Sequence, residues 1–153
     1  MDIAPRLKSE ARERGFALAG IAPATDADGF AHFTDWLDRG YAGEMDYLHE
    51  KREERRHPRS VLASVRSVLM LGMEYGGESK GDRRTGRVAK YAQGPEYHRF
   101  IWDRMNDLAM WLEAESPGSA ARAVADTAPL LERDFARRAG LGWIGKNTLL
   151  INP

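Results

Sequence analysis

Apolar residues recur at helical spacing in four stretches of the chain. The stretches at 3–14 and 27–39 are each followed by a glycine, which can adopt the left-handed conformation that ends many helices. Two further helices are expected at 95–115, which opens on a proline, and at 128–139. The pattern therefore predicts four amphipathic helices, each with one buried face.

Denser apolar runs without helical spacing lie between these helices. The clearest is 66–76, which is apolar almost throughout and predicts a strand covered on both faces. Shorter strands are expected at 16–23, 87–92, 122–126 and 147–151. This alternation predicts one domain over residues 1–153, an α/β or α+β sandwich with a mixed sheet flanked by helices. Because the last apolar run stops almost at the final residue, we expect the chain to be cut from a longer protein.

The composition excludes several classes of protein. Lys plus Arg and Asp plus Glu each number 23, so the zero net charge gives no overall attraction to nucleic acid or membrane. No apolar run is long enough for a transmembrane helix, and the charged N-terminus is unlike a secretory signal. Cysteine is absent, which excludes disulfides and thiolate metal sites. A cytoplasmic protein without membrane attachment is expected.

Three glycines at 140, 142 and 145 form a G-x-G-x-x-G sequence. A dinucleotide-binding fingerprint needs a strand before the glycines and a helix after them, and here the predicted order is reversed. The same segment places Trp143 beside Lys146 and Asn147, an aromatic plate next to polar side chains. It is either a ligand-binding surface or a tight turn with Trp143 in the core.

Asp126 also has two possible roles. It ends the predicted strand 122–126, so its carboxyl could cap the following helix. Alternatively, it is a general acid at the carboxyl end of a strand, where an apolar pocket would raise its pKa. Only four histidines occur, without a metal-binding spacing, so no zinc site is expected.

Five motifs in sequence order resemble epoxyqueuosine reductases. They are GEMDYL at 43–48, RSVLMLGMEY at 66–75, YAQGPEYH at 91–98, DTAPLLER at 126–133 and AGLGWIGKNTLLI at 139–151. This family reduces the epoxide of epoxyqueuosine to queuosine at the wobble position of tRNA, using cobalamin and two [4Fe–4S] clusters. The resemblance implies the amino-terminal cobalamin-binding domain, with a nitroreductase-like fold. The iron–sulfur and carboxyl-terminal domains would lie outside the chain.

The resemblance also implies roles for individual residues. Asp126 would be the proton donor, and no protein side chain would bind the metal. The residues expected to bind the cofactor are Arg56, Tyr91, Trp143, Gly145, Lys146 and Asn147. Glu96 stands where the family is expected to have an aspartate, which leaves the role of that carboxylate open.

The implied partners are tRNA and an external electron donor, and the protein is expected to be a monomer. Two groups of basic residues could form a rim that attracts RNA, or could simply be solvated polar faces: Arg133, Arg137, Arg138 and Lys146, and Arg83, Arg84, Arg87 and Lys90. Two other functions remain possible, a corrinoid carrier without catalysis and a flavin-dependent reductase domain. An isolated fragment of the enzyme is expected to be inactive.

Overall fold

The computed structural model describes residues 2–75, 89 and 96–153. At its centre lie two antiparallel strands, β1 (Leu18–Pro23) and β2 (Ser67–Gly72). Their register runs from Leu18 opposite Gly72 to Pro23 opposite Ser67. Both strands were expected at these places, because their apolar residues must be covered from two sides.

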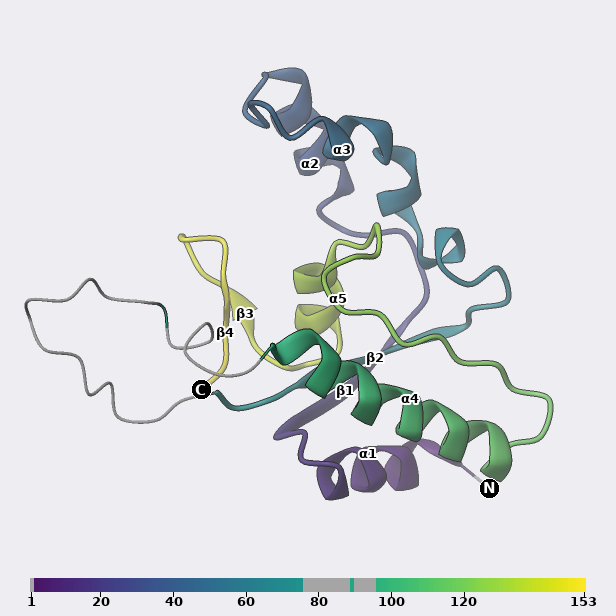
Figure 1. The fold of residues 1–153 in the computed structure, drawn as a ribbon. Coiled ribbons are helices and arrows are strands. Elements are labelled where there is room, and N and C mark those ends of the chain that lie inside the picture. Colours follow the sequence, from purple (N-terminus) through teal and green to yellow (C-terminus); the bar gives the residue numbers. More distant parts are fainter. Residues whose placement is uncertain (1, 76–88, 90–95) are drawn as a thin grey trace, which may run out of the picture.

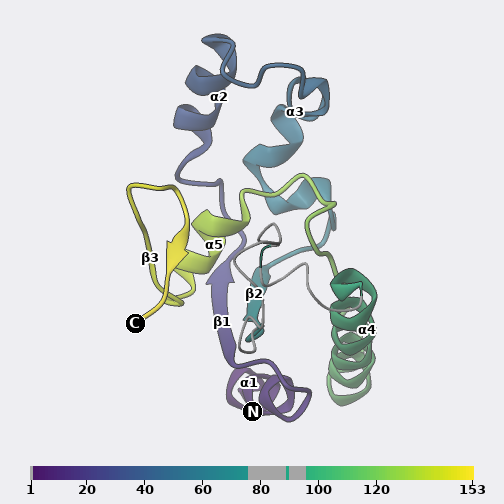
Figure 2. The same ribbon diagram turned by 60° about the vertical axis from the view of Figure 1, so that its left-hand side comes forward.

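Helices cover this strand pair on both faces (Figure 2). Successive residues of a strand point to opposite faces. Ile21 and Leu69 pack in a cluster with α1 (Ala4–Glu13) and α4 (Tyr97–Glu115). Ala22 instead packs on the other side with Phe135 of α5 (Glu132–Arg138). The predicted sandwich of helices and strands is therefore confirmed.

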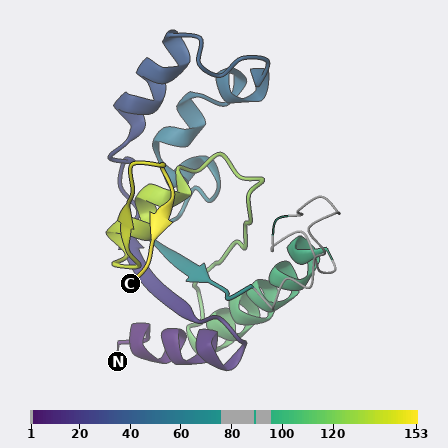
Figure 3. The ribbon, with the colours of Figure 1, turned by 90° about the vertical axis from the view of Figure 1, so that its left-hand side faces the viewer.

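Residues 24–66 leave the sheet between β1 and β2 and project from it (Figures 1 and 3). The excursion holds α2 (Phe30–Asp38), α3 (Asp46–Glu50) and the short 3₁₀ helices η1 (Glu53–Arg56) and η2 (Pro58–Ser60). A hydrogen bond from Ala24 N to Arg66 O, 3.1 Å long, closes its base. Many charged residues, at 50–59, lie on this excursion, where Arg52 forms an ion pair with Asp38.

The carboxyl-terminal third differs from expectation. The segment 122–126 is not a strand, and Asp126 at its end has a φ of 58°, outside the extended region. The last helix starts at Glu132, later than predicted. The expected strand at 147–151 is reduced to β4 (Leu150–Ile151), which pairs with β3 (Trp143–Ile144) in a separate antiparallel hairpin.

Only some of the strands of the predicted mixed sheet lie among the described residues, so only their pairing is seen. Both sheets formed by the described residues are antiparallel. The expected strand at 87–92 falls almost entirely outside those residues. Within the described ranges, no helix is both long enough and apolar enough to cross a bilayer.

Candidate functional site

Asp126 lies beside the start of α4. The Tyr97 hydroxyl donates a hydrogen bond of 2.6 Å to Asp126 Oδ2, and His98 Nε2 lies 3.3 Å from the same oxygen. The Tyr97 and His98 rings stack with centroids 4.0 Å apart. The two motifs that carry Tyr97, His98 and Asp126 are thus brought together, although they are separated by almost the whole of α4.

The backbone of Asp126 rules out the role of helix cap. The N-cap of α5 is Leu131, five residues further on, and no side chain caps that helix. The left-handed conformation of Asp126 costs an ordinary residue about 1–2 kcal/mol and persists only where surrounding contacts hold it. The Asp126 side chain is 56% exposed, so the expected apolar pocket around it is not present among the described residues.

Glu96 fixes the orientation of His98. As the N-cap of α4, its carboxylate accepts hydrogen bonds of 2.9 Å from the backbone N–H groups of His98 and Arg99. It also contacts His98 Nδ1 at 2.5 Å. These backbone N–H groups, followed by the His98 side chain, lower the pKa of Glu96. The carboxylate whose role the sequence left open therefore caps the helix and holds the imidazole.

Glu132 is a second carboxyl of this region that sequence reasoning missed. Burial raises its pKa, and the charge of Asp126 raises it further. A hydrogen bond from the Asp126 backbone N–H and the nearby Arg55 guanidinium act in the opposite direction. A partly buried carboxyl with a raised pKa thus lies six residues after Asp126. Its spacing from Asp126 is visible in the sequence, but its burial is not.

The Trp143 side chain is exposed on the β3–β4 hairpin rather than buried in the core. It is 52% accessible. The hairpin turn is closed by two backbone hydrogen bonds of 2.9 Å, from Gly145 N to Leu149 O and from Thr148 N to Gly145 O. A Cβ on Gly145 would lie 2.6 Å from Ile151 Cδ1. Packing within the hairpin therefore accounts for this glycine.

The exposed turn presents Lys146 and Asn147 close to Trp143 in sequence and on the same hairpin. The Asn147 side-chain oxygen accepts a 3.2 Å hydrogen bond from Leu149 N, so this oxygen is used within the turn. Thr148 has a φ of 65°, an uncommon conformation for a β-branched residue. Arg133 of α5 donates hydrogen bonds to the Thr148 carbonyl and, at 2.9 Å, to its hydroxyl.

Of the two remaining residues predicted to bind the cofactor, Arg56 and Tyr91, only Arg56 is among the described residues. Arg56 lies on η1, where it pairs with Glu53 and stacks 4.4 Å from the Phe30 ring centroid. Tyr91 lies outside the described residues, as do Arg83, Arg84, Arg87 and Lys90 of the proposed basic rim.

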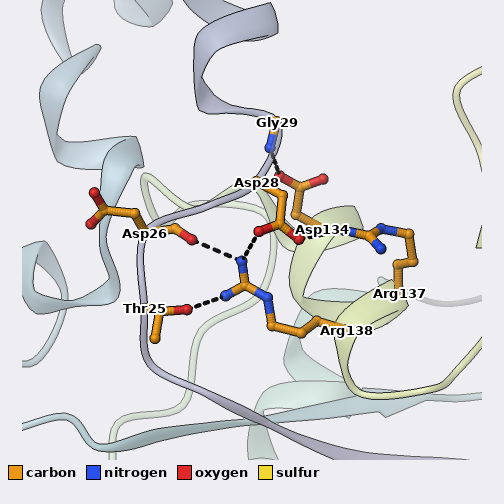
Figure 4. A network of polar contacts seen from close by, with 7 residues as sticks. All are labelled: Thr25, Asp26, Asp28, Gly29, Asp134, Arg137 and Arg138. Carbon is orange, nitrogen blue, oxygen red and sulfur yellow. Dashed lines mark hydrogen bonds and ion pairs between the residues drawn. The ribbon is translucent and has the colours of Figure 1, made fainter.

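Arg137 and Arg138, also predicted for this rim, are used within the fold (Figure 4). Both form ion pairs with Asp28, and Arg138 also binds Thr25 Oγ1 at 2.7 Å. The guanidinium groups lower the pKa of Asp28, with the Arg138 hydrogen bond as the largest cause. These contacts join α5 to the loop before α2.

A hollow of about 650 Å³ lies elsewhere in the described part of the molecule. It is lined by the end of α1, the end of β2 and one side of α4, and Asp126 is not among its lining residues. Within the same residues, no cluster of His, Asp and Glu side chains could hold a metal ion. The site around Asp126 is therefore an open surface beside α4 and α5.

Comparison with known proteins shows which family the chain resembles. Residues 55–127 match the family described as epoxyqueuosine reductase QueG, DUF1730. An epoxyqueuosine reductase from Gloeobacter violaceus is 43% identical over 152 residues, which cover 97% of this chain and 47% of the relative. The chain is similar to epoxyqueuosine reductases over almost its whole length. It spans about half the length of the curated relatives it matches, including one from Pseudomonas aeruginosa that is 38% identical over 98% of this chain and 43% of the relative.

Solved epoxyqueuosine reductases share the fold. The enzyme from Streptococcus thermophilus superimposes with a TM-score of 0.88 at 26% identity, covering 99% of this chain and 42% of that chain. A second structure, solved with an epoxyqueuosine-modified tRNA-Tyr stem loop, gives a TM-score of 0.81 at 23% identity over 97% of this chain and 41% of that one. The arrangement of helices around the central strands is therefore that of the family.

Proposed function

We propose that this chain is the cobalamin-binding part of an oxidoreductase that converts epoxyqueuosine in tRNA to queuosine. Similarity to epoxyqueuosine reductases supports the reaction, and the relative solved with a modified tRNA stem loop supports tRNA as the substrate. The observation that carries the role of this chain is the hydrogen bond between Tyr97 and Asp126. It holds a solvent-accessible carboxyl beside two other polar side chains.

The proton-transfer role falls to Asp126. Conversion of an epoxide to an alkene takes up two electrons and two protons and releases the oxygen as water. The Asp126 carboxyl gives one proton to the epoxide oxygen, while Tyr97 and His98 keep it in position. A relative from Bacillus subtilis has a catalytic aspartate loop that swings out of its active site, and Asp126 here also lies on a loop.

The residues of the β3–β4 hairpin fit a large, flat cofactor. Trp143 exposes an aromatic face, and Lys146 and Asn147 are exposed beside the turn. A corrin ring has a broad apolar face with amide groups at its rim, which matches this combination. We propose that Trp143, Gly145, Lys146 and Asn147 hold cobalamin, with Tyr91 and Arg56 as further contacts. When bound, cobalamin would supply the electrons for the reduction.

The iron–sulfur clusters would be held elsewhere. Such clusters need cysteine thiolates, and this chain has no cysteine. We therefore place them in the remaining half of the full-length protein, where they would receive electrons from an external donor. We also propose that the enzyme is cytoplasmic and monomeric.

The experiment that tests the proposal compares wild type with Asp126→Asn in the full-length protein. Asparagine also tolerates the left-handed conformation but has no acidic proton, so turnover of epoxyqueuosine-containing tRNA should be lost while cobalamin binding is retained. A corrinoid carrier would show unchanged cobalamin handling in both proteins and no turnover in either. Tight binding of flavin, with no spectral response to cobalamin, would instead identify a flavin-dependent reductase.

A further inference from the structure

The imidazole of His98 contacts two carboxylates, one with each ring nitrogen. Nδ1 lies 2.5 Å from Glu96 Oε1, and Nε2 lies 3.3 Å from Asp126 Oδ2. Glu96 is the N-cap of α4, whereas Asp126 lies in the loop that precedes α5. The His98 ring therefore connects a carboxylate fixed at the end of a helix with the proposed proton donor on a loop.

The contact with Glu96 determines which nitrogen of a neutral His98 carries the proton. The Glu96 carboxylate accepts hydrogen bonds of 2.9 Å from the backbone N–H groups of His98 and Arg99, and these bonds lower its pKa. A carboxylate that stays charged can only accept hydrogen bonds, so Nδ1 must donate to it. In the neutral imidazole, Nε2 then has no proton, and it is Nε2 that faces Asp126 Oδ2.

Nε2 is thus the position at which His98 gains and loses a proton. As an imidazolium it can donate a proton to Asp126 Oδ2, and as a neutral ring it can accept one from the protonated carboxyl. The Tyr97 hydroxyl donates a 2.6 Å hydrogen bond to the same oxygen, and the Tyr97 and His98 rings stack with centroids 4.0 Å apart. Stacking and the contact with Glu96 together keep the imidazole directed at Asp126.

The proposed reaction needs two protons, of which Asp126 carries one. Two electrons from the reduced cofactor form the C=C bond as both C–O bonds of the epoxide break, and the oxygen leaves as water with both protons. After the first proton has been given, Asp126 is a carboxylate and cannot donate again until it is protonated. A proton source within reach of this carboxylate is therefore needed for the second half of the reaction.

We propose that His98 is a proton relay, which passes a proton from Nε2 to Asp126 Oδ2 after Asp126 has protonated the epoxide oxygen. The N–H bond at Nε2 breaks and an O–H bond forms on Asp126, which then gives the second proton to the departing oxygen. Neutral His98 regains its proton from water. Glu96 holds the ring throughout, because Nδ1 donates to it in both charge states. The relay rests on the proposed function, whereas the tautomer of His98 does not.

The tautomer can be measured without activity, by ¹⁵N NMR of full-length protein labelled on histidine, at a pH at which the imidazoles are neutral. We expect neutral His98 to carry its proton on Nδ1. His57 is an internal control, because its Nδ1 accepts a 3.0 Å hydrogen bond from Arg59 N and its proton should therefore lie on Nε2. His98→Gln identifies the His98 signals by their loss. A proton on Nε2 of neutral His98 would overturn the inference.

A variant of Glu96 tests the origin of this tautomer. Serine is also a good N-cap, so Glu96→Ser keeps an acceptor at the start of α4 and removes the carboxylate at Nδ1 of His98. Neutral His98 should then show a mixture of tautomers, while His57 is unchanged. A proton that stays on Nδ1 in Glu96→Ser would overturn the role assigned to Glu96.

The relay itself is tested by single-turnover rates of prereduced full-length enzyme on epoxyqueuosine-containing tRNA. His98→Gln keeps an N–H donor but has no proton to transfer, so the rate should fall about tenfold to hundredfold. In His98→Ala, added imidazole should restore part of the lost rate in proportion to its concentration, which a purely structural role would not allow. His32→Ala, an exposed histidine on α2, is the control and should keep the wild-type rate with no response to imidazole.

The outcomes separate this inference from the proposed function. A wild-type rate in His98→Gln would overturn the relay and leave the function standing. A reduced rate in His98→Ala that imidazole does not restore would make His98 a support for Asp126 and would also overturn the relay. If wild type does not act on epoxyqueuosine-containing tRNA, the proposed function fails, and the NMR measurement still decides whether Nε2 can exchange a proton with Asp126.

Discussion

The Tyr97 hydroxyl and the Asp126 carboxylate form a hydrogen bond of 2.6 Å across 29 residues of sequence. Tyr97 is the first residue of α4, and Glu96 immediately before it caps the helix. Because α4 packs in the cluster that includes α1 and both central strands, the start of the helix is a stable platform for a loop residue. Tyr97 therefore connects Asp126 to the packed core.

Replacement of this tyrosine should weaken catalysis more than folding. Tyr97→Phe removes the hydrogen-bond donor and keeps the ring, so we expect a loss in turnover of about tenfold, the usual effect of losing a hydrogen bond to a charged group. Turnover of modified tRNA and thermal unfolding are measured on the full-length protein. Tyr47→Phe is the control, because Tyr47 carries the same hydroxyl group and lies on α3, in the excursion between β1 and β2. An undiminished rate in Tyr97→Phe would remove Tyr97 from the site.

Trp143 should contribute to cofactor affinity and little to stability. More than half of its side chain is accessible, so Trp143→Ala should change the free energy of unfolding by about 1 kcal/mol or less. Loss of an aromatic contact face should lower cobalamin affinity about tenfold or more.

Titration of full-length protein followed by visible absorption measures the cobalamin affinity of Trp143→Ala. Tyr41→Ala is the control for an exposed aromatic residue, because Tyr41 is exposed in the turn that follows α2. This variant should bind cobalamin as wild type does. Unchanged affinity in Trp143→Ala would place the cofactor away from the hairpin.

The sequence predicted those parts of the fold that depend on local pattern. The apolar run at 66–76 and the helical spacing at 95–115 correspond to β2 and α4, because burial of their apolar residues leaves few alternatives. The strand expected at 122–126 was wrong because the conformation of Asp126 depends on distant partners. No local sequence pattern indicates that Tyr97 and Glu132 lie close to Asp126.

In the candidate site, too, the sequence indicated features that depend on local pattern and missed those that depend on distant contacts. Asp126 was selected because it ends a predicted strand, and Trp143 because it lies among glycines beside Lys146 and Asn147; both assignments remain predictions. The partial burial of Glu132 and the exposure of Trp143 could not be predicted from the sequence, because both depend on how α5 and the β3–β4 hairpin pack in the folded protein. For Arg137 and Arg138 the sequence left open a rim for RNA or a solvated polar face, and it did not indicate their ion pairs with Asp28.

Asp28 should make stability depend on pH in the acidic range. Its hydrogen bond with Arg138, and then the charges of both arginines, lower its pKa in the folded state. A lowered pKa means that the stabilisation is present above the ordinary pKa of aspartate, about 3.9, and is lost as the pH falls through the folded-state value. The stability difference between wild type and Asp28→Asn should therefore be largest near neutral pH and shrink on acidification.

Denaturant unfolding of both proteins between pH 3 and 7 measures this dependence. Because Asp28 is about half exposed, added salt should reduce the difference as well. Asp35→Asn is the control, since Asp35 pairs with Arg39 on α2 alone and does not join two elements. A difference that grows as the pH falls would contradict the assigned role of Asp28.

Gly20 on β1 should be the glycine at which a side chain is least tolerated in the sandwich. A Cβ there would lie 2.5 Å from the Ala139 carbonyl oxygen and 2.8 Å from Leu141 Cδ2, so α5 could not keep its place against the strand. Gly20→Ala should lower the free energy of unfolding by about 1–3 kcal/mol, as overpacking of a core does. Gly72→Ala on β2 is the matched control, because its nearest neighbour is the flexible Leu18 side chain at 3.1 Å. Denaturant unfolding measures both variants, and equal stability of the two would show that α5 does not rest closely on β1.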